Sequence, residues 1–144
     1  MGIRVLRNEH VLIGEDGAGF VLAGVDDSTA HRLAEGHRED VAAAVAGVGP
    51  EKEVVLLAHQ PKAIFEAAKH GVGLQISGHT HGGQIWPFTL FVHLAQPYVA
   101  GLARHGATQI YVSRGTGHWG PPMRLGAPSE LTLIELVRDG SPIV

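Results

Sequence analysis

The chain has 144 residues, 44% of them hydrophobic and 17% charged, which excludes a disordered polymer and suffices for one domain with a core. Its net charge of -3 and its scattered Lys and Arg residues give no electrostatic footprint for nucleic acid or an anionic membrane surface. The lack of cysteine excludes disulfides and thiolate metal sites. Residues 1–10 lack the apolar segment of a signal peptide, and no window resembles a membrane helix, so we expect a soluble, cytoplasmic chain.

Short strands and turns are predicted for the first quarter of the chain. Ile3–Leu6 and Val11–Ile13 are candidate strands, and a turn follows at Glu15–Gly17. Phe20–Val25 is a nearly continuous apolar run, which is typical of a strand buried on both faces. Residues 29–47 are rich in alanine and predict helix with a break at Gly36.

The middle of the chain predicts a strand–helix–strand unit. Glu53–Ala58 is an apolar strand, Pro61 suits the first turn of a following helix, and Gly71 suits its end. Gly73–Ser77 is the next strand. Because a helix joins the two strands, we expect them to pair in parallel.

The remainder of the chain is harder to interpret. Short strands are expected around Gln84–Trp86 and Tyr98–Ala100, with a turn region at Gly101–Gly106. Gln109–Ser113 and Leu131–Val137 are expected to be strands on either side of a Gly- and Pro-rich loop at 114–128. Nothing divides the chain, so we expect one α/β domain over residues 1–144.

Three histidines lie directly after predicted strands. His59 follows the first strand of the central unit, and His79 and His81 follow the second. The carboxyl ends of neighbouring parallel strands meet at one edge of a sheet, where α/β proteins bind ligands. In an extended segment His79 and His81 would project to the same side. A histidine near a strand end is most often a surface or core residue, so the alternative to a metal site is three unrelated side chains.

The segments that contain these histidines resemble the calcineurin-like metallophosphoesterase family. Gly78–Gln84 reads GHTHGGQ, as in that family, and Leu57–Pro61 is similar to its preceding histidine block. The resemblance to one bacterial subgroup extends over nearly the whole chain. It includes Gly2–His10, Leu22–Asp27, Ser113–Gly117, Trp119–Pro122 and Arg124–Gly126.

The resemblance implies a fold, a reaction and a set of ligands. The fold is a four-layer α/β/β/α sandwich, and the reaction is hydrolysis of a phosphomonoester or phosphodiester at a two-metal site. The residues matching His59 and His79 bind the second metal, and the residue matching His81 binds the first. Nitrogen and oxygen ligands suit Mn, Fe, Zn, Co or Ni. Many members of the subgroup are tethered to a membrane by upstream segments.

The chain also departs from the family pattern. Family members begin with Asp-x-His, Gly-Asp and Gly-Asn-His-Asp/Glu blocks, which supply the bridging carboxylate and a catalytic histidine, and none of these occurs here. The chain is therefore expected to be a C-terminal half that needs a missing N-terminal half or forms an oligomer. The alternatives are a metal-binding remnant without catalysis and an interaction fragment.

Five further positions are weaker candidates. Arg114 and His118, in the Gly- and Pro-rich loop, are candidates for substrate contact, since the planar guanidinium of Arg suits phosphate. For Arg114 a surface position or a structural salt bridge is an equal alternative, and for His118 a packed loop residue is favoured. For Arg124 a surface or structural role is favoured. Asp26 and Asp27 could offer carboxylates, but capping or turn formation is the favoured interpretation.

Overall fold

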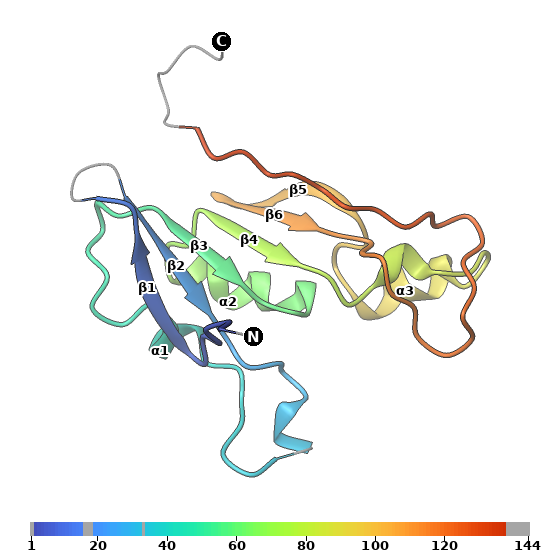
Figure 1. The fold of residues 1–144 in the computed structure, drawn as a ribbon, viewed down its shortest axis with the longest axis horizontal. Helices are drawn as coiled ribbons and strands as arrows, with labels where there is room; N and C mark the ends of the chain where they lie inside the picture. Colours follow the sequence, from blue (N-terminus) through green and yellow to red (C-terminus); the bar gives the residue numbers. More distant parts are fainter. Residues whose placement is uncertain (1, 16–18, 33, 138–144) are drawn as a thin grey trace.

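One mixed six-stranded β-sheet organises the described part of the chain, residues 2–15, 19–32 and 34–137 of a computed structural model (Figure 1). The strand order is β1-β2-β3-β4-β6-β5. The four inner strands run parallel, and β1 and β5 pair antiparallel at the two edges. The strands are β1 (Glu9–Ile13), β2 (Phe20–Gly24), β3 (Val54–Leu57), β4 (Leu74–Ser77), β5 (Gly101–His105) and β6 (Thr108–Val112).

The central strand–helix–strand unit is confirmed. Strand β3 leads through a 3-10 turn, η2 (Pro61–Ala63), into helix α2 (Ile64–Lys69), and β4 then pairs parallel to β3. Helix α2 ends just before Gly71, where the Val72 N–H donates to the Ala67 carbonyl at 3.2 Å. The α/β class expected from the sequence is therefore confirmed, with a mixed sheet.

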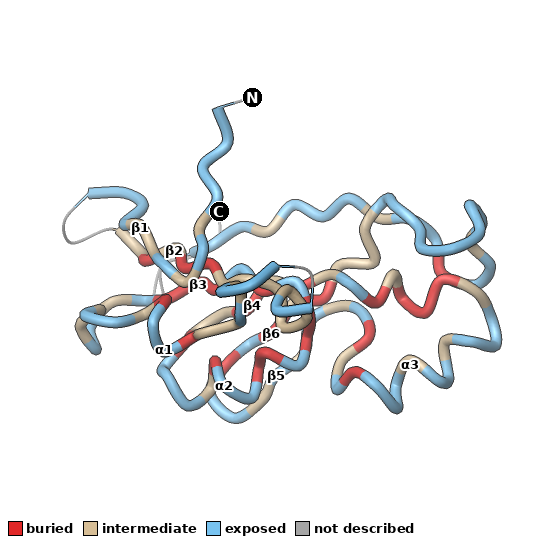
Figure 2. The backbone as a smooth tube through the Cα atoms, turned by 90° about the horizontal axis from the view of Figure 1, so that it is seen from below, coloured by how far each residue is buried: buried red, intermediate tan, exposed pale blue. Residues whose placement is uncertain are grey.

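The core lies on one face of this sheet, between the strands and two helices (Figure 2). Helix α1 (Val41–Ala44) packs on β1 and β2, and α2 packs on β5 and β6. Alternate strand residues point to this face, and they are almost completely buried. They include Val21, Ala23, Val54, Leu56, Ile110 and Val112.

The opposite face of the sheet carries a row of partly exposed apolar side chains. The strand registers place Leu57, Ile76 and Tyr111 side by side, and Leu102 continues the row onto β5. Leu57 and Leu102 are 40% and 67% exposed, and the two residues between them are half-buried. This face therefore has less cover than the helical face, although its side chains are apolar.

The helix predicted over residues 29–47 is largely wrong. The described residues of this range contain only a 3-10 turn, η1 (Ala30–Arg32), and the single turn of α1, which Asp40 caps by accepting from the Ala43 N–H. The side chain of Asn8 donates to the Arg38 carbonyl and accepts from the Asp40 N–H, which holds the segment before α1 in a non-helical conformation. Alanine content is a weak signal because short helices depend on packing.

Two other predicted strands are also wrong. Ile3–Leu6 and Leu131–Val137 lie in coil, and Leu131 and Leu133 are 95% and 94% exposed. Both segments have apolar side chains but pair with no strand among the described residues. The turn predicted at Glu15–Gly17 includes residues 16–18, which lie outside the described residues.

The region after β4 differs most from the predictions. Gly101–His105 is strand β5, not a turn, and it forms a hairpin with β6. Tyr98–Ala100 is coil, and Gln84–Trp86 contributes only isolated bridges from Ile85. A 3-10 turn, η3 (His81–Gly83), precedes Gln84, and a helix, α3 (Thr89–Ala95), lies between Trp86 and Tyr98.

Candidate functional site

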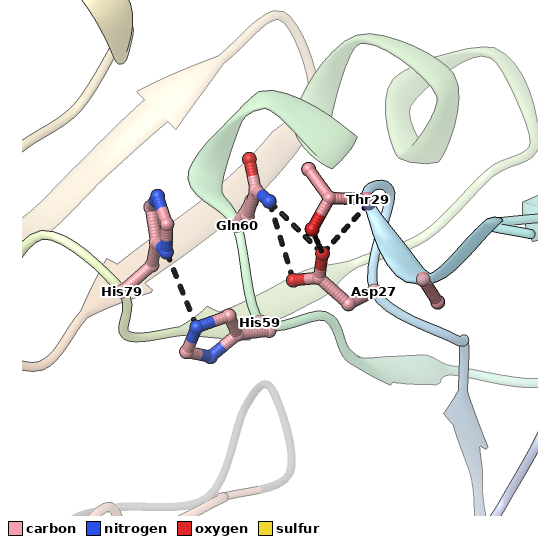
Figure 3. Close-up of a pocket in the computed structure, with 6 residues that line it drawn as sticks. Asp27, Thr29, His59, Gln60 and His79 are labelled. Carbon is pink, nitrogen blue, oxygen red and sulfur yellow. Dashed lines mark hydrogen bonds between the residues drawn. The ribbon is translucent and has the colours of Figure 1, made fainter. Parts of the chain in front are cut away.

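Three strands deliver polar side chains to one edge of the sheet. Asp27 follows β2, His59 follows β3 and His79 follows β4, and these strands are parallel neighbours. Asp27, His59 and His79 line one pocket of about 420 Å³ with Thr29 and Gln60 (Figure 3). The expectation that His59 and His79 meet at the carboxyl ends of adjacent strands agrees with this geometry.

The imidazoles of His59 and His79 face each other directly. Nε2 of His59 and Nδ1 of His79 are hydrogen-bonded at 3.2 Å, and the rings are nearly perpendicular, with centroids 5.0 Å apart (Figure 3). His79 adopts a φ of 69°, in the left-handed region that an L-residue rarely takes. This backbone conformation aims the His79 ring back across the strand end toward His59.

The separation of the two nitrogens fits a shared metal ion. With metal–nitrogen bonds of about 2.1 Å, two ligand nitrogens lie roughly 3.0 Å apart at a right angle and roughly 3.4 Å apart at a tetrahedral angle. The observed 3.2 Å falls between these values. Burial and the neighbouring His59 lower the pKa of His79, and this favours the neutral ring that a metal ion requires.

Asp27 is held in the same pocket by hydrogen bonds. Its carboxylate accepts from the Thr29 N–H at 2.7 Å and from the side-chain amide of Gln60 at 3.1 and 3.2 Å. Burial works to raise the pKa of Asp27, but the hydrogen bonds from Thr29 and Gln60 and the nearby His59 together hold it below its ordinary value. Asp27 therefore stays ionised and supplies a negative charge beside the imidazoles.

A buried polar network supports the strand ends behind the pocket. The amide of Gln75 donates to the Ser77 hydroxyl at 2.8 Å, and that hydroxyl donates to the Ala58 carbonyl at 2.7 Å. Gln60 receives a further hydrogen bond from Gln96 at 3.4 Å. Because these side chains are almost completely buried, the network fixes the chain on either side of His59.

His81 occupies a different position from the one expected. The segment after Gly78 is a turn, not an extended strand: Thr80 is helical, and His81 begins η3 with a φ of 50°. The segment is therefore not the extended one from which projection of His79 and His81 to the same side was expected. Among the residues that the structure describes, no three His, Asp or Glu side chains are arranged to hold one metal ion.

Arg124 fixes His81 and the loop around it. The guanidinium donates to the His81 carbonyl and to Nδ1 of its ring, both at 3.2 Å, and to the Arg114 carbonyl at 2.8 Å. It also donates to the carbonyls of Gly117 and Ala127. Burial and the charge of Arg124 lower the pKa of His81. The guanidinium has no lone pair, so His81 can bind an ion through Nδ1 only after Arg124 turns away.

The two predicted phosphate-contacting residues lie on the His81 side of the site. The aliphatic part of Arg114 packs on Gly82, where a Cβ atom would lie 2.9 Å from its Cγ, and its guanidinium is 3.5 Å from Glu130. Arg114 lines a second pocket of about 370 Å³ that also includes Gly82 and Tyr98. His118 is exposed, and its charge contributes to the lowered pKa of His81.

Two residues of the main pocket were undervalued by sequence reasoning. Asp27 forms the turn that was favoured for it, through Thr29, but it also faces His59 across the pocket. Its position after a parallel strand, as for His59, was the available signal. Gln60 carried no signal, because its role depends on the tertiary contact with Asp27.

Comparison with known proteins finds relatives over nearly the whole of this chain. An "Uncharacterized metallophosphoesterase" of Helicobacter pylori strain J99 is 45% identical over 139 residues, covering 95% of this chain and 36% of that protein. A bovine "Transmembrane protein with metallophosphoesterase domain" is 40% identical over 152 residues, covering 99% and 34%. The "Uncharacterized metallophosphoesterase YkuE" of Bacillus subtilis is 34% identical over 140 residues, covering 94% and 47%.

These matches define the class of protein. The chain belongs to the calcineurin-like metallophosphoesterase family. It spans about a third of the length of the first relatives it matches. No family model and no solved structure matches the chain. Within residues 2–15, 19–32 and 34–137, no helix is long and apolar enough to cross a membrane.

Proposed function

We propose that this chain contributes the histidine side of a two-metal site that hydrolyses a phosphomonoester or phosphodiester. The observation that carries the proposal is the 3.2 Å separation of the ring nitrogens of His59 and His79 at adjacent strand ends. In this proposal the two imidazoles bind the second metal ion. His81 binds the first ion after exchanging its contact with Arg124.

Each part of the pocket then has a distinct task. Divalent ions held there, drawn from Mn, Fe, Zn, Co and Ni, would supply Lewis-acid stabilisation of the phosphoryl charge and a source of activated water. His59 and His79 orient the second ion, and Asp27 offsets its positive charge through the pocket. Arg114 and His118 are proposed to contact a nonbridging phosphate oxygen from the loop side.

The site is proposed to be completed by residues outside these 144. The chain spans about a third of the length of its first relatives. Among the described residues, only two imidazoles, those of His59 and His79, are placed to share one metal ion. The apolar row Leu57–Ile76–Tyr111–Leu102 gives a second sheet a surface on which to pack. We therefore propose a four-layer sandwich whose other half comes from another segment or a second chain, in a parent protein tethered to a membrane.

A non-catalytic metal-binding role is the second candidate. Its support is that the ring nitrogens of His59 and His79 lie at a separation that fits one shared ion, whereas among the described residues no third His, Asp or Glu joins them. Such a protein would bind a divalent ion and hydrolyse no phosphate ester.

Hydrolysis of bis(p-nitrophenyl) phosphate with Mn²⁺ tests the first proposal. The 144-residue chain would be assayed alone and fused to a family segment that carries the Asp-x-His, Gly-Asp and Gly-Asn-His blocks. We expect turnover only from the fusion, and we expect His59→Ala and His79→Ala each to reduce it by about 100-fold or more. His70→Ala, an exposed histidine after α2, is the matched control and should leave the rate unchanged.

The possible outcomes separate the components of the proposal. A fusion whose turnover survives both His59→Ala and His79→Ala would overturn the assignment of these ligands. Turnover by the unfused chain that the double substitution His79→Ala/His81→Ala abolishes would contradict the proposal that the site needs residues outside this chain. It would still support the proposed metal site. A folded fusion that binds metal without turnover would favour the non-catalytic role.

A further inference from the structure

Helix α3 is apolar, but it packs little against the rest of the protein. Its sequence is TLFVHLA, and each of its residues is at least partly exposed, with Phe91 at 59% and Leu94 at 85%. It lies at the opposite end of the molecule from β1 and is drawn almost entirely as exposed in Figure 2. A contiguous exposed apolar surface on a folded protein indicates an interaction site.

Aromatic side chains extend this surface onto the segments beside the helix. The ring of Phe88 lies 5.8 Å from that of Phe91 and 5.5 Å from that of Trp119, which comes from the Gly- and Pro-rich loop. Trp86 is 57% exposed, and its backbone N–H donates to the backbone carbonyl of Leu125, in the same loop. We call this surface the α3 patch. It consists of Trp86, Phe88, Leu90, Phe91, Leu94 and Trp119.

The charge of the chain is unevenly distributed along the sequence. Residues 70–130, which include every patch residue, contain Arg104, Arg114 and Arg124 and one acidic residue, Glu130, which pairs with Arg114 at 3.5 Å, so this segment has a net charge of +2. The whole chain has 11 Lys and Arg and 14 Asp and Glu, so the other residues have 8 against 13, a net charge of -5. The net charge of -3 therefore conceals a cationic segment that contains the patch.

We infer that the α3 patch docks on the surface of a lipid bilayer that contains anionic lipids. Trp and Phe are favoured at the boundary between headgroups and acyl chains, and Leu side chains can enter the apolar layer. Anionic headgroups attract the cationic segment and repel the acidic remainder of the chain. Helix α3 is far too short to span a bilayer, so the docking is interfacial.

This orientation brings the candidate site toward the headgroups. The side chain of Gln84 connects the two, because it accepts from the Trp119 N–H and donates to the Trp119 carbonyl, both at 2.7 Å, while its backbone N–H donates to His81. Gln84 therefore connects the α3 patch directly to His81. The docking itself requires no phosphoesterase activity, so it can be tested independently of the proposed function.

The two tryptophans provide a direct measurement. The chain contains only Trp86 and Trp119, and both belong to the α3 patch, so tryptophan fluorescence reports on this surface alone. Vesicles of phosphatidylcholine, with and without roughly one third phosphatidylglycerol, would be added to the 144-residue chain. We expect a blue shift of the emission, co-flotation with the vesicles, and tighter binding to the anionic ones.

Matched substitutions test the location of the contact. Phe91→Ser and Leu94→Ser should each weaken vesicle partitioning by about tenfold, because each removes an apolar group that would enter the bilayer. Leu12→Ser changes a leucine on β1 that is 46% exposed, at the other end of the molecule, and should leave partitioning unchanged. All three side chains are exposed, so we expect these variants to unfold at the same temperature as the parent chain.

Three results would overturn the inference. The first is tryptophan emission that neither kind of vesicle changes. The second is a lipid-free dimer that hides the tryptophans and dissociates in Phe91→Ser, which would make the patch an interface between two copies. The third is an equal loss of partitioning in Leu12→Ser. If a variant fails to fold, quenching of the unmodified chain by brominated acyl chains gives the same answer, because tryptophans outside the bilayer are not quenched.

Discussion

Helices α2 and α3 are both short and apolar, but they have opposite surroundings. In α2, Ile64 and Ala67 are fully buried against the sheet, whereas each residue of α3 is partly or fully exposed. The difference lies in their connections. Helix α2 joins two paired parallel strands, so the connection between these strands packs it against the sheet. Helix α3 follows the η3 turn outside such a unit, so its apolar side chains are available to a partner.

The largest expected effect is on stability, and it separates the two helices. Ile64→Ala should lower the free energy of unfolding by about 2–5 kcal/mol, because it leaves a cavity in the core. Phe91→Ala should change it by less than about 0.5 kcal/mol, because the side chain is exposed. Urea denaturation followed by circular dichroism measures both values. Similar losses for the two variants would show that α3 is packed as firmly as α2.

A second substitution tests how α3 is attached. Gly83 has a φ of +81°, and a Cβ atom there would lie 2.4 Å from the Thr89 Cα atom at the start of α3. Gly83→Ala should cost about 1–3 kcal/mol and displace α3 from η3. Gly101→Ala is the control, because its φ of +80° is similar but its Cβ atom would meet open space. The unfolding midpoints of the two variants should differ, with Gly83→Ala the lower, and equal midpoints would contradict the close contact.

A third prediction concerns the loop that carries Trp119. Arg124→Ala removes the donors that hold the carbonyls of Arg114 and Gly117, so limited proteolysis should cleave within residues 114–128 faster than in the parent chain. The pKa of His81 should rise, because the charge of Arg124 contributes to lowering it. Histidine NMR titration measures that pKa, and an unchanged or lower value would exclude the contact.

The smallest predicted effect concerns pH at the main pocket. Because burial and His59 lower the pKa of His79, the folded state holds the neutral ring more strongly than the unfolded chain does. This contribution to stability is present above the ordinary imidazole pKa of about 6.5 and is lost as the pH falls toward the folded value. Metal binding through His79 should likewise persist somewhat below pH 6.5.

The charge of Asp27 modulates the same group. It raises the pKa of His79, so Asp27→Asn should lower that pKa further. Asp26→Asn is the control, because the Asp26 carboxylate pairs with Arg7 at 3.1 Å instead of facing the pocket. A lowering of the His79 pKa in NMR titration by Asp26→Asn, or none by Asp27→Asn, would contradict this arrangement.

The sequence predicted those parts of the fold that arise from local patterns and short connections. The parallel pairing of β3 and β4, and with it the meeting of His59 and His79, followed from two apolar runs joined by a helix. Prediction from the sequence failed where tertiary contacts determine the local structure. Asn8 holds residues 38–40 in a non-helical conformation, and β5 forms because it pairs with β6. The left-handed conformations of His79 and His81 also could not be read from an expected extended segment.

The most direct test of the metal site is a titration of the 144-residue chain with Zn²⁺, followed by calorimetry. If the two nitrogens 3.2 Å apart share one ion, a single site should appear, and His59→Ala and His79→Ala should each weaken it by at least about tenfold. His70→Ala should have no effect, since this residue lies outside the pocket. Zn²⁺ affinity that is unchanged by both His59→Ala and His79→Ala would contradict the proposed metal site.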